Sequence, residues 1–203
     1  MGMIPLSKTG RMAAPVERIT MPIAIVVVVL VLLAVGGVGI YNGIVTKRNR
    51  CDNAWQTIET QLQRRNDLIP NLVETVKGYA SHESETLAAV TAARAASTSA
   101  TTPGEVAAAE NQVMGALRQL LVVAEAYPDL KANANFQQLQ SDLTDTENKI
   151  SYARQSYNDC VLTYNNAIQT FPGNLVAGFG HFDPKQGFVV EDEAARKAPK
   201  VQF

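Results

Sequence analysis

Five charged residues interrupt the apolar stripes of the sequence at helical spacing, and their types are those that could carry out chemistry. An arginine or glutamate at such a position belongs either to a buried polar site or to an ionic contact that fixes how helices align. No serine-nucleophile motif, glycine-rich phosphate loop or paired-cysteine motif accompanies them. We therefore interpret them as a structural polar seam without a catalytic residue: Arg65, Glu83, Glu110, Glu147 and Arg154.

Three of these residues are glutamates on three predicted helices, which is a feature of di-iron carboxylate bundles. That class of bundle also pairs a glutamate with a histidine three residues later on two helices. The only histidines are His82 and His181, and neither follows a glutamate at that spacing. Two histidines and two distant cysteines, Cys51 and Cys160, do not form a zinc motif. The sequence predicts no metal and no cofactor.

The two cysteines are too few for a disulfide framework. They could form one bridge in an extracytoplasmic domain, although free thiols on helices are the commoner arrangement. The chain has 18 Lys and Arg against 19 Asp and Glu, a net charge of −1, and 6% aromatic residues. Because it has neither a basic field nor a cluster of stacking side chains, we exclude nucleic acid as a partner.

The elements that position these residues begin with an uncharged segment from Ile23 to Ile40. A helix needs about twenty apolar residues to cross the hydrocarbon core of a bilayer, and residues 21–41 supply that length. A cleaved signal peptide is the alternative, but its apolar core is usually about seven to fifteen residues long. We predict an N-terminal tail over residues 1–20 and one transmembrane helix over 21–41. A basic stop-transfer flank follows this helix: Lys47, Arg48 and Arg50.

Behind the span, apolar residues recur every three or four positions, which predicts amphipathic helices. The first stretch reaches about Ser99 and keeps its phase across Pro70, which favours one continuous, kinked helix. The segment STSATTPG ends it, and two further helices are predicted over about 105–126 and 134–171.

The fold class predicted from this pattern is all-α. A single N-terminal transmembrane helix continues into an elongated antiparallel three- or four-helix bundle over residues 42–173. The remainder, residues 174–203, contains glycines, prolines and isolated phenylalanines and is predicted to be an irregular tail. Its aromatic residues either bridge neighbouring copies or pack on the bundle.

The first helix is predicted to be about 75 Å long and the second about 33 Å. Either the third helix runs back toward the membrane to cover the first, or other copies of the chain do. Small residues in the span also allow close approach of two helices, and Gly39 with Gly43 has the small-xxx-small spacing. The candidate contacts between copies are therefore Gly36, Gly39, Gly43, Trp55, Ile58 and Leu62.

Several motifs follow the apolar segment, among them Tyr41-Asn42, Ala54-Trp55 and the run QLQRRNDLIPNLVETVKGYASHE over residues 61–83. With these motifs the chain resembles the LemA family of bacterial membrane-anchored proteins. It covers nearly all of the chain after Tyr41 and continues through Ala93-Arg94, residues 125–133, Ala153-Arg154, Tyr157-Asn158, Tyr164-Asn165 and Phe171-Pro172. The resemblance implies a helical bundle behind one membrane anchor.

The side of the membrane that the bundle occupies stays open. Basic residues flank the span on both sides, so the charge rule does not choose. If translation starts at Met21, the preceding basic residues are absent and the rule favours a cytoplasmic bundle. Some relatives carry a lipid-modified cysteine ahead of the same Tyr-Asn pair, which favours an extracytoplasmic bundle, but this chain has no cysteine there.

Together these features predict a self-associating scaffold or adaptor at the bacterial cell membrane, with lipid, other copies and a membrane protein as partners and no enzymatic activity. The resemblance extends the expectation to organising or shaping the membrane, since a relative takes part in building magnetosome membranes. One alternative is a partner subunit of a membrane protease or another envelope complex. Another is an envelope hydrolase that uses the seam carboxylates as acid and base.

Overall fold

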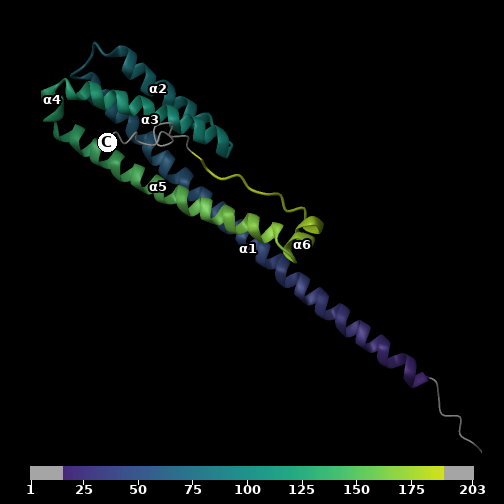
Figure 1. The fold of residues 1–203 in the computed structure, drawn as a ribbon. Coiled ribbons are helices and arrows are strands. Elements are labelled where there is room, and N and C mark those ends of the chain that lie inside the picture. The colour runs from purple at the N-terminus through teal and green to yellow at the C-terminus, as the bar shows by residue number, and fades with distance from the viewer. Residues whose placement is uncertain (1–15, 190–203) are drawn as a thin grey trace, which may run out of the picture.

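The structure is a computed structural model that describes residues 16–189, with side chains from residue 21 onward. Within this range the chain forms helices and no strand, which confirms the predicted all-α fold class. The helices are α1 (Val16–Lys77), α2 (Ser84–Ser99), α3 (Pro103–Glu125), α4 (Pro128–Lys131), α5 (Ala134–Gln169) and α6 (Gly173–Gly180). Figure 1 shows that α1 is the axis of an elongated molecule, with α5 beside its second half and α2 and α3 at one end.

The first part of α1 is the one helix in the described range that is long and apolar enough to cross a membrane. Its most apolar window is 0% buried inside the protein, so it is not a core helix. Large apolar side chains from Met21 to Val38 are exposed on all sides. The helix begins at Val16, so it includes the end of the segment predicted as an N-terminal tail, and residues 1–15 lie outside the described residues.

α1 continues through Pro70, as the phase of the apolar stripe predicted. Proline has no N–H, so the carbonyl oxygen four residues earlier, that of Asn66, loses its helical hydrogen bond. Arg94 on α2 replaces the missing donor, since its Nε donates to the Asn66 carbonyl oxygen at 2.8 Å. The proline inside α1 is therefore accommodated by a side chain from a neighbouring helix.

The predicted first helix, which was expected to reach Ser99, is in fact two helices. α1 ends at Lys77, and the N–H groups of Tyr79 and Ala80 both donate to the carbonyl oxygen of Val76 as the chain turns. α2 then runs back along α1, so that Leu87 packs in the same core as Val76. The prediction was wrong because regular spacing shows that residues share a face and does not show that one helix carries them all.

α5 runs in the direction opposite to α1, because Glu147 lies beside Arg65 while Cys160 packs near Cys51, further toward the N-terminus of α1. Ile58 is 0% exposed and Leu62 7% exposed in the core that α5 completes. Of the two alternatives, the third helix therefore covers the first within the same chain.

The buried residues form two separate clusters along the axis of the molecule. We call the cluster nearer the apolar part of α1 the proximal core and the other the distal core. The proximal core contains residues of α1, α3, α5, α6 and the segment after α6, among them Ile44, Ile58, Tyr157, Tyr164 and Phe188. The distal core contains residues of α1 to α5, among them Leu72, Val90, Leu120, Leu130 and Phe136.

The segment predicted as an irregular tail is partly helical and partly extended. α6 is followed by residues 181–189, which carry no helix and run along the bundle (Figure 1). Phe182 is 8% exposed and Phe188 1% exposed, so these two aromatic residues pack on their own bundle. Phe203, the last of the aromatic residues, lies outside the described residues.

Candidate functional site

The two most deeply buried charges, Arg65 on α1 and Glu110 on α3, form an ionic layer together with the partly exposed Glu147 on α5. Arg65 is 1% exposed and Glu110 3% exposed. One guanidinium nitrogen of Arg65 pairs with the Glu110 carboxylate, and the other donates to Glu147 Oε2 at 3.1 Å. The layer lies between the two cores, because Leu62 belongs to the proximal core and Ile69 to the distal core.

Two further polar residues connect α2 to this layer. The Ser97 hydroxyl donates to Glu110 Oε1 at 3.1 Å, and the Asn66 amide nitrogen donates to the Ser97 hydroxyl at 3.2 Å. Side chains of α1, α2, α3 and α5 thus meet in one continuous hydrogen-bonded network. A network of this kind fixes both the axial alignment and the rotation of the helices, because each donor needs its acceptor at one position.

The electrostatics of the layer favour a structural role. Burial lowers the pKa of the Arg65 guanidinium, and the nearby Glu147 carboxylate raises it again. A cavity of about 280 Å³ adjoins the layer; Glu147 and Arg118 line it, together with apolar residues such as Leu72 and Leu117. Glu110, the partner that a two-carboxylate acid and base mechanism would need, does not line this cavity.

The other two residues of the predicted seam lie elsewhere. Glu83 precedes α2, where its carboxylate accepts a hydrogen bond from the Tyr127 hydroxyl at 3.2 Å. Arg154 is half-buried and its guanidinium lies over the Phe188 ring, 5.3 Å from the centroid. The structure therefore brings together three of the five seam residues, whereas Glu83 and Arg154 lie outside the ionic layer.

Asn66, Arg94 and Ser97 are the network residues that the sequence analysis missed. Ser97 was assigned to the turn segment STSATTPG, but α2 extends to Ser99 and keeps Ser97 on a helix. Asn66 follows Arg65 directly and precedes Pro70 by four residues, and this spacing was the available signal, since a proline leaves that carbonyl oxygen unpaired.

A second polar constellation holds the extended segment against α5. The amides of Asn158 and Asn165 each donate to and accept from one backbone position, at Phe188 and at Lys185, with distances between 2.8 and 3.0 Å. The hydroxyls of the preceding residues, Tyr157 and Tyr164, donate to backbone carbonyl oxygens of the same segment at 2.9 Å. Two Tyr-Asn pairs seven residues apart therefore bind the backbone of residues 183–188, which we call the strap.

The strap also contacts α1. Lys185 Nζ lies 2.7 Å from Asp52 Oδ1, and Phe188 meets the ring of Trp55 with a centroid distance of 5.8 Å. Gly187 passes close to α5, since a Cβ at this position would lie 3.1 Å from Asn158 Oδ1. Trp55 is therefore covered by its own chain, and the expectation that Trp55, Ile58 and Leu62 need another copy loses its basis.

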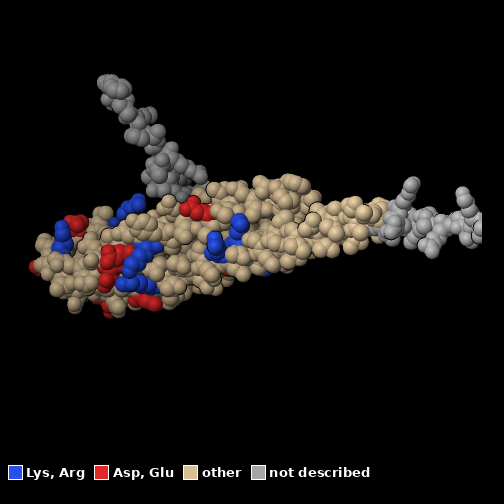
Figure 2. All heavy atoms as spheres, turned by 90° about the horizontal axis from the view of Figure 1, so that it is seen from below, with Lys and Arg blue, Asp and Glu red and all other residues tan. Residues whose placement is uncertain are grey.

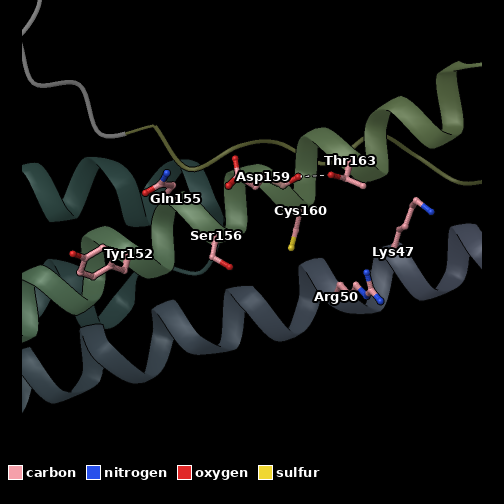
Figure 3. Close-up of a pocket in the computed structure, with 8 residues that line it drawn as sticks. All are labelled: Lys47, Arg50, Tyr152, Gln155, Ser156, Asp159, Cys160 and Thr163. Carbon is pink, nitrogen blue, oxygen red and sulfur yellow. Dashed lines mark hydrogen bonds between the residues drawn. The ribbon is translucent and has the colours of Figure 1, made fainter.

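An open groove of about 400 Å³ runs between α1 and α5 on the proximal half of the molecule. Figure 3 shows Lys47 and Arg50 on α1 at one end of the groove, while α5 contributes Asp159 and the thiol of Cys160. Both cysteines are free, and burial raises the pKa of the Cys51 thiol. A raised thiol pKa keeps Cys51 in the weakly nucleophilic protonated form.

The glycine candidates have open surroundings. A Cβ added at Gly36, Gly39 or Gly43 would meet nothing within 4 Å. At about 3.6 residues per turn, these three glycines lie on the side of α1 opposite Val38 and Tyr41, which contact α6. Within the described part of the chain, no group of three His, Cys, Asp or Glu residues is placed to hold a metal ion.

The sequence of this chain is similar to those of several known proteins. The sequence model of the LemA family matches residues 54–203. Protein LemA of Metamycoplasma hominis is 29% identical over 144 residues, which cover 69% of this chain and 64% of that protein. The magnetosome protein MamQ of Magnetospirillum gryphiswaldense is 24% identical over 163 residues, which cover 68% of this chain and 60% of MamQ. The chain thus aligns with less than two thirds of the length of these relatives.

Proposed function

This chain belongs to the LemA family, and from that premise and the structure we propose that it is a membrane-anchored, self-associating scaffold or adaptor without catalytic activity. One observation carries the proposal: α1 is a single helix that runs from its apolar segment to Lys77 and contributes Leu72 and Val76 to the distal core. At 1.5 Å per residue its 62 residues are about 93 Å long. With no loop between span and bundle, the anchor fixes the orientation of the bundle relative to the membrane surface.

Rigid coupling of this kind suits a protein that holds partners at a set height above a membrane. A tethered enzyme needs a cleft with convergent reactive groups, whereas the carboxylates of the ionic layer are occupied by Arg65 and Ser97. The magnetosome name of MamQ supports a role in organising a membrane. The alternative proposal is that the chain acts as an adaptor by serving as a partner subunit of a membrane protease or another envelope complex.

Self-association is proposed through the glycine face of the span. Gly36 and Gly39 are exposed and Gly43 is partly buried, and a Cβ at any of the three would meet nothing within 4 Å. Small residues let two spans approach closely in lipid. This face differs from the face of α1 that α5 and α6 cover, so pairing of spans requires no change in the bundle.

Disulfide cross-linking in native membranes tests the proposal. Single cysteines are placed at Gly39, on the glycine face, and at Thr57, which is exposed on the bundle, in chains that carry Cys51→Ala and Cys160→Ala. We expect Gly39→Cys to yield covalent dimers and Thr57→Cys to stay monomeric. Equal absence of dimers in both would refute self-association. Co-purification in mild detergent then tests the adaptor, and an unaccompanied monomer would refute that role too.

A further inference from the structure

We propose that α6 is a second membrane-contacting element, whose apolar face enters the phospholipid bilayer in the leaflet through which α1 leaves it. The inference rests on the proposed membrane anchoring by α1 and adds a contact that orients the bundle. The occupant of this face is lipid, namely the upper acyl chains and the glycerol region of a phospholipid layer.

The composition around α6 is unusual for a surface element. The sequence has no Asp, Glu, Lys or Arg from Cys160 to Phe182. Three large apolar side chains near the turn are exposed: Phe171 is 79% exposed, Leu175 56% and Phe179 89%. The opposite face of α6 is fixed to the protein, since Ala177 is 6% exposed in the proximal core. The helix is therefore held firmly while it presents its apolar residues outward, and such patches mark contact sites.

The position of α6 along α1 sets its depth. Val176, Phe179 and Gly180 share a groove of about 400 Å³ with residues of the last turns of the apolar segment, from Ala34 to Tyr41. Ala34 and Tyr41 are seven residues apart, which corresponds to about 10 Å along a helix. Helices that lie in a membrane interface are buried by about 5 to 10 Å. The stretch of the apolar segment that lies beside α6 has about this length.

Close packing holds α6 at this level. A Cβ at Gly180 would come within 2.5 Å of the Phe182 ring and 3.3 Å of the Tyr41 ring, so glycine allows the end of α6 to lie against α1. His181 then ends the helix in the left-handed conformation, with φ of 50°, and turns the chain toward the strap. The rings of Tyr41 and Phe182 meet edge to face with centroids 5.3 Å apart.

The charge distribution along α1 agrees with this position of α6 at the membrane surface. After the apolar segment, the first basic residue of α1 is Lys47, six residues after Tyr41, which is about 9 Å further along the helix. That distance places it at the outer edge of the polar headgroup layer, which is about 5 to 8 Å thick on each side of the hydrocarbon. On the face shown in Figure 2, the surface between the basic group at mid-molecule and the grey N-terminal residues carries no charged side chain.

Continuity with the span favours lipid over a second protein. Val38 is exposed on α1 and lines the groove shared with Phe179, so that the apolar surface of α6 joins that of the span. A partner protein would have to displace lipid from α1 as well as cover α6. The face of α1 that is suited to another span, with Gly36 and Gly39, lies on the opposite side.

Depth-dependent fluorescence quenching of the full chain in phosphatidylcholine and phosphatidylglycerol vesicles tests the proposal. Single cysteines at Phe179 on α6, Val31 in the span and Tyr152 on α5 are labelled with an environment-sensitive nitrobenzoxadiazole dye, with Cys51→Ala and Cys160→Ala throughout. Tyr152 is the matched control for Phe179, since both side chains are largely exposed, by 74% and 89%. We expect acyl-chain spin-labelled lipids to quench the dye at positions 179 and 31 at least twofold more than the dye at 152.

Other outcomes would distinguish failure of the membrane contact by α6 from failure of the anchoring by α1. Quenching at position 31 with none at 179 would overturn the membrane contact of α6 while anchoring by α1 stands. No quenching at either position would overturn the anchoring and the inference together. A blue-shifted dye at 179 that lipid does not quench would identify a protein contact there, and would also overturn the inference.

Discussion

The proximal and distal regions lie on the same two long helices, but they are built in different ways. The distal core contains residues of five helices, α1 to α5, and is mainly aliphatic, with Leu72, Leu120 and Leu130 each 0% exposed. The proximal core has chiefly α1 and α5, and Phe188 of the strap together with Phe182, which precedes the strap, completes it. Two helices cannot enclose a core by themselves, because each buries only one stripe against the other.

The comparison teaches how an extended segment can substitute for a helix. A helix satisfies its own backbone groups, whereas the strap has none of those bonds and must find partners elsewhere. The paired amides of Asn158 and Asn165 and the two tyrosine hydroxyls provide them. The proximal region therefore depends on side chain to backbone hydrogen bonds, and the distal region depends on apolar packing between helices.

The largest expected effect concerns the ionic layer that separates the regions. Arg65→Met removes the only guanidinium between two carboxylates, and leaving a buried charge without its partner costs about 3 to 5 kcal/mol. We expect a large fall in the thermal unfolding midpoint of the detergent-solubilised protein, measured by circular dichroism. Arg64→Met, at the neighbouring exposed position, is the matched control and should change little.

Simultaneous replacement of the whole layer sharpens this prediction. Arg65→Met with Glu110→Leu and Glu147→Met leaves no unpaired charge, so most of the lost stability should return. If Arg65→Met and Arg64→Met shifted the midpoint equally, the layer would not be the junction on which both regions depend.

The next effect is confined to the proximal region. Phe188→Ala removes a ring that is 1% exposed, and truncation of a buried phenylalanine costs about 3 kcal/mol or more. Hydrogen exchange should accelerate in the strap and in the adjoining turns of α5, whereas α2 and α3 keep their protection. Val189→Ala, at a 62% exposed position, is the control. Uniform acceleration over all helices would show that the two regions are not distinct.

A smaller effect belongs to the distal region. Arg94→Met deprives the Asn66 carbonyl oxygen of its donor, and hydrogen bonds to charged groups contribute about 1.5 to 3 kcal/mol. In a Pro70→Ala background the backbone N–H of residue 70 becomes the donor, so the same substitution should cost less. Urea unfolding of the four variants measures this coupling. Additive effects would mean that Arg94 acts independently of the proline.

The smallest effect concerns the first turn of α3. Hydrogen bonds from the backbone N–H groups of Thr102 and Thr101 lower the pKa of the exposed Glu105 carboxyl from 4.5 to about 2. The folded-state pKa is depressed, so this stabilisation is present above pH 4.5 and is lost as the pH falls toward 2. Glu105→Gln should therefore lower the unfolding midpoint slightly at pH 7 and not at pH 2. Glu85→Gln, in the first turn of α2, serves as control, and a difference that persists at pH 2 would contradict the assignment.

The all-α class, the apolar segment and the burial of Arg65 and Glu110 were predictable from the sequence, whereas the division between α1 and α2 and the short helices α4 and α6 were not. Each of the predictable features depends on local spacing or on composition, so a single segment of the chain contains the information needed to predict it. Continuity of α1 across Pro70 was predictable for the same reason. The family resemblance carried by residues 61–83 was also readable, since the motif lies within one segment.

Which helix faces pack against each other could be seen only in the tertiary structure. The stripe through Leu87 kept its phase beyond Lys77, although the chain turns there and folds back, because periodicity reports a face and not its partner. The Tyr157-Asn158 and Tyr164-Asn165 pairs were visible in the sequence, but the segment that they bind was not, since they contact backbone atoms, which are the same in every residue. The place of α6 beside Tyr41 depends on the return path of α5 over its full length, and only the assembled bundle sets that path.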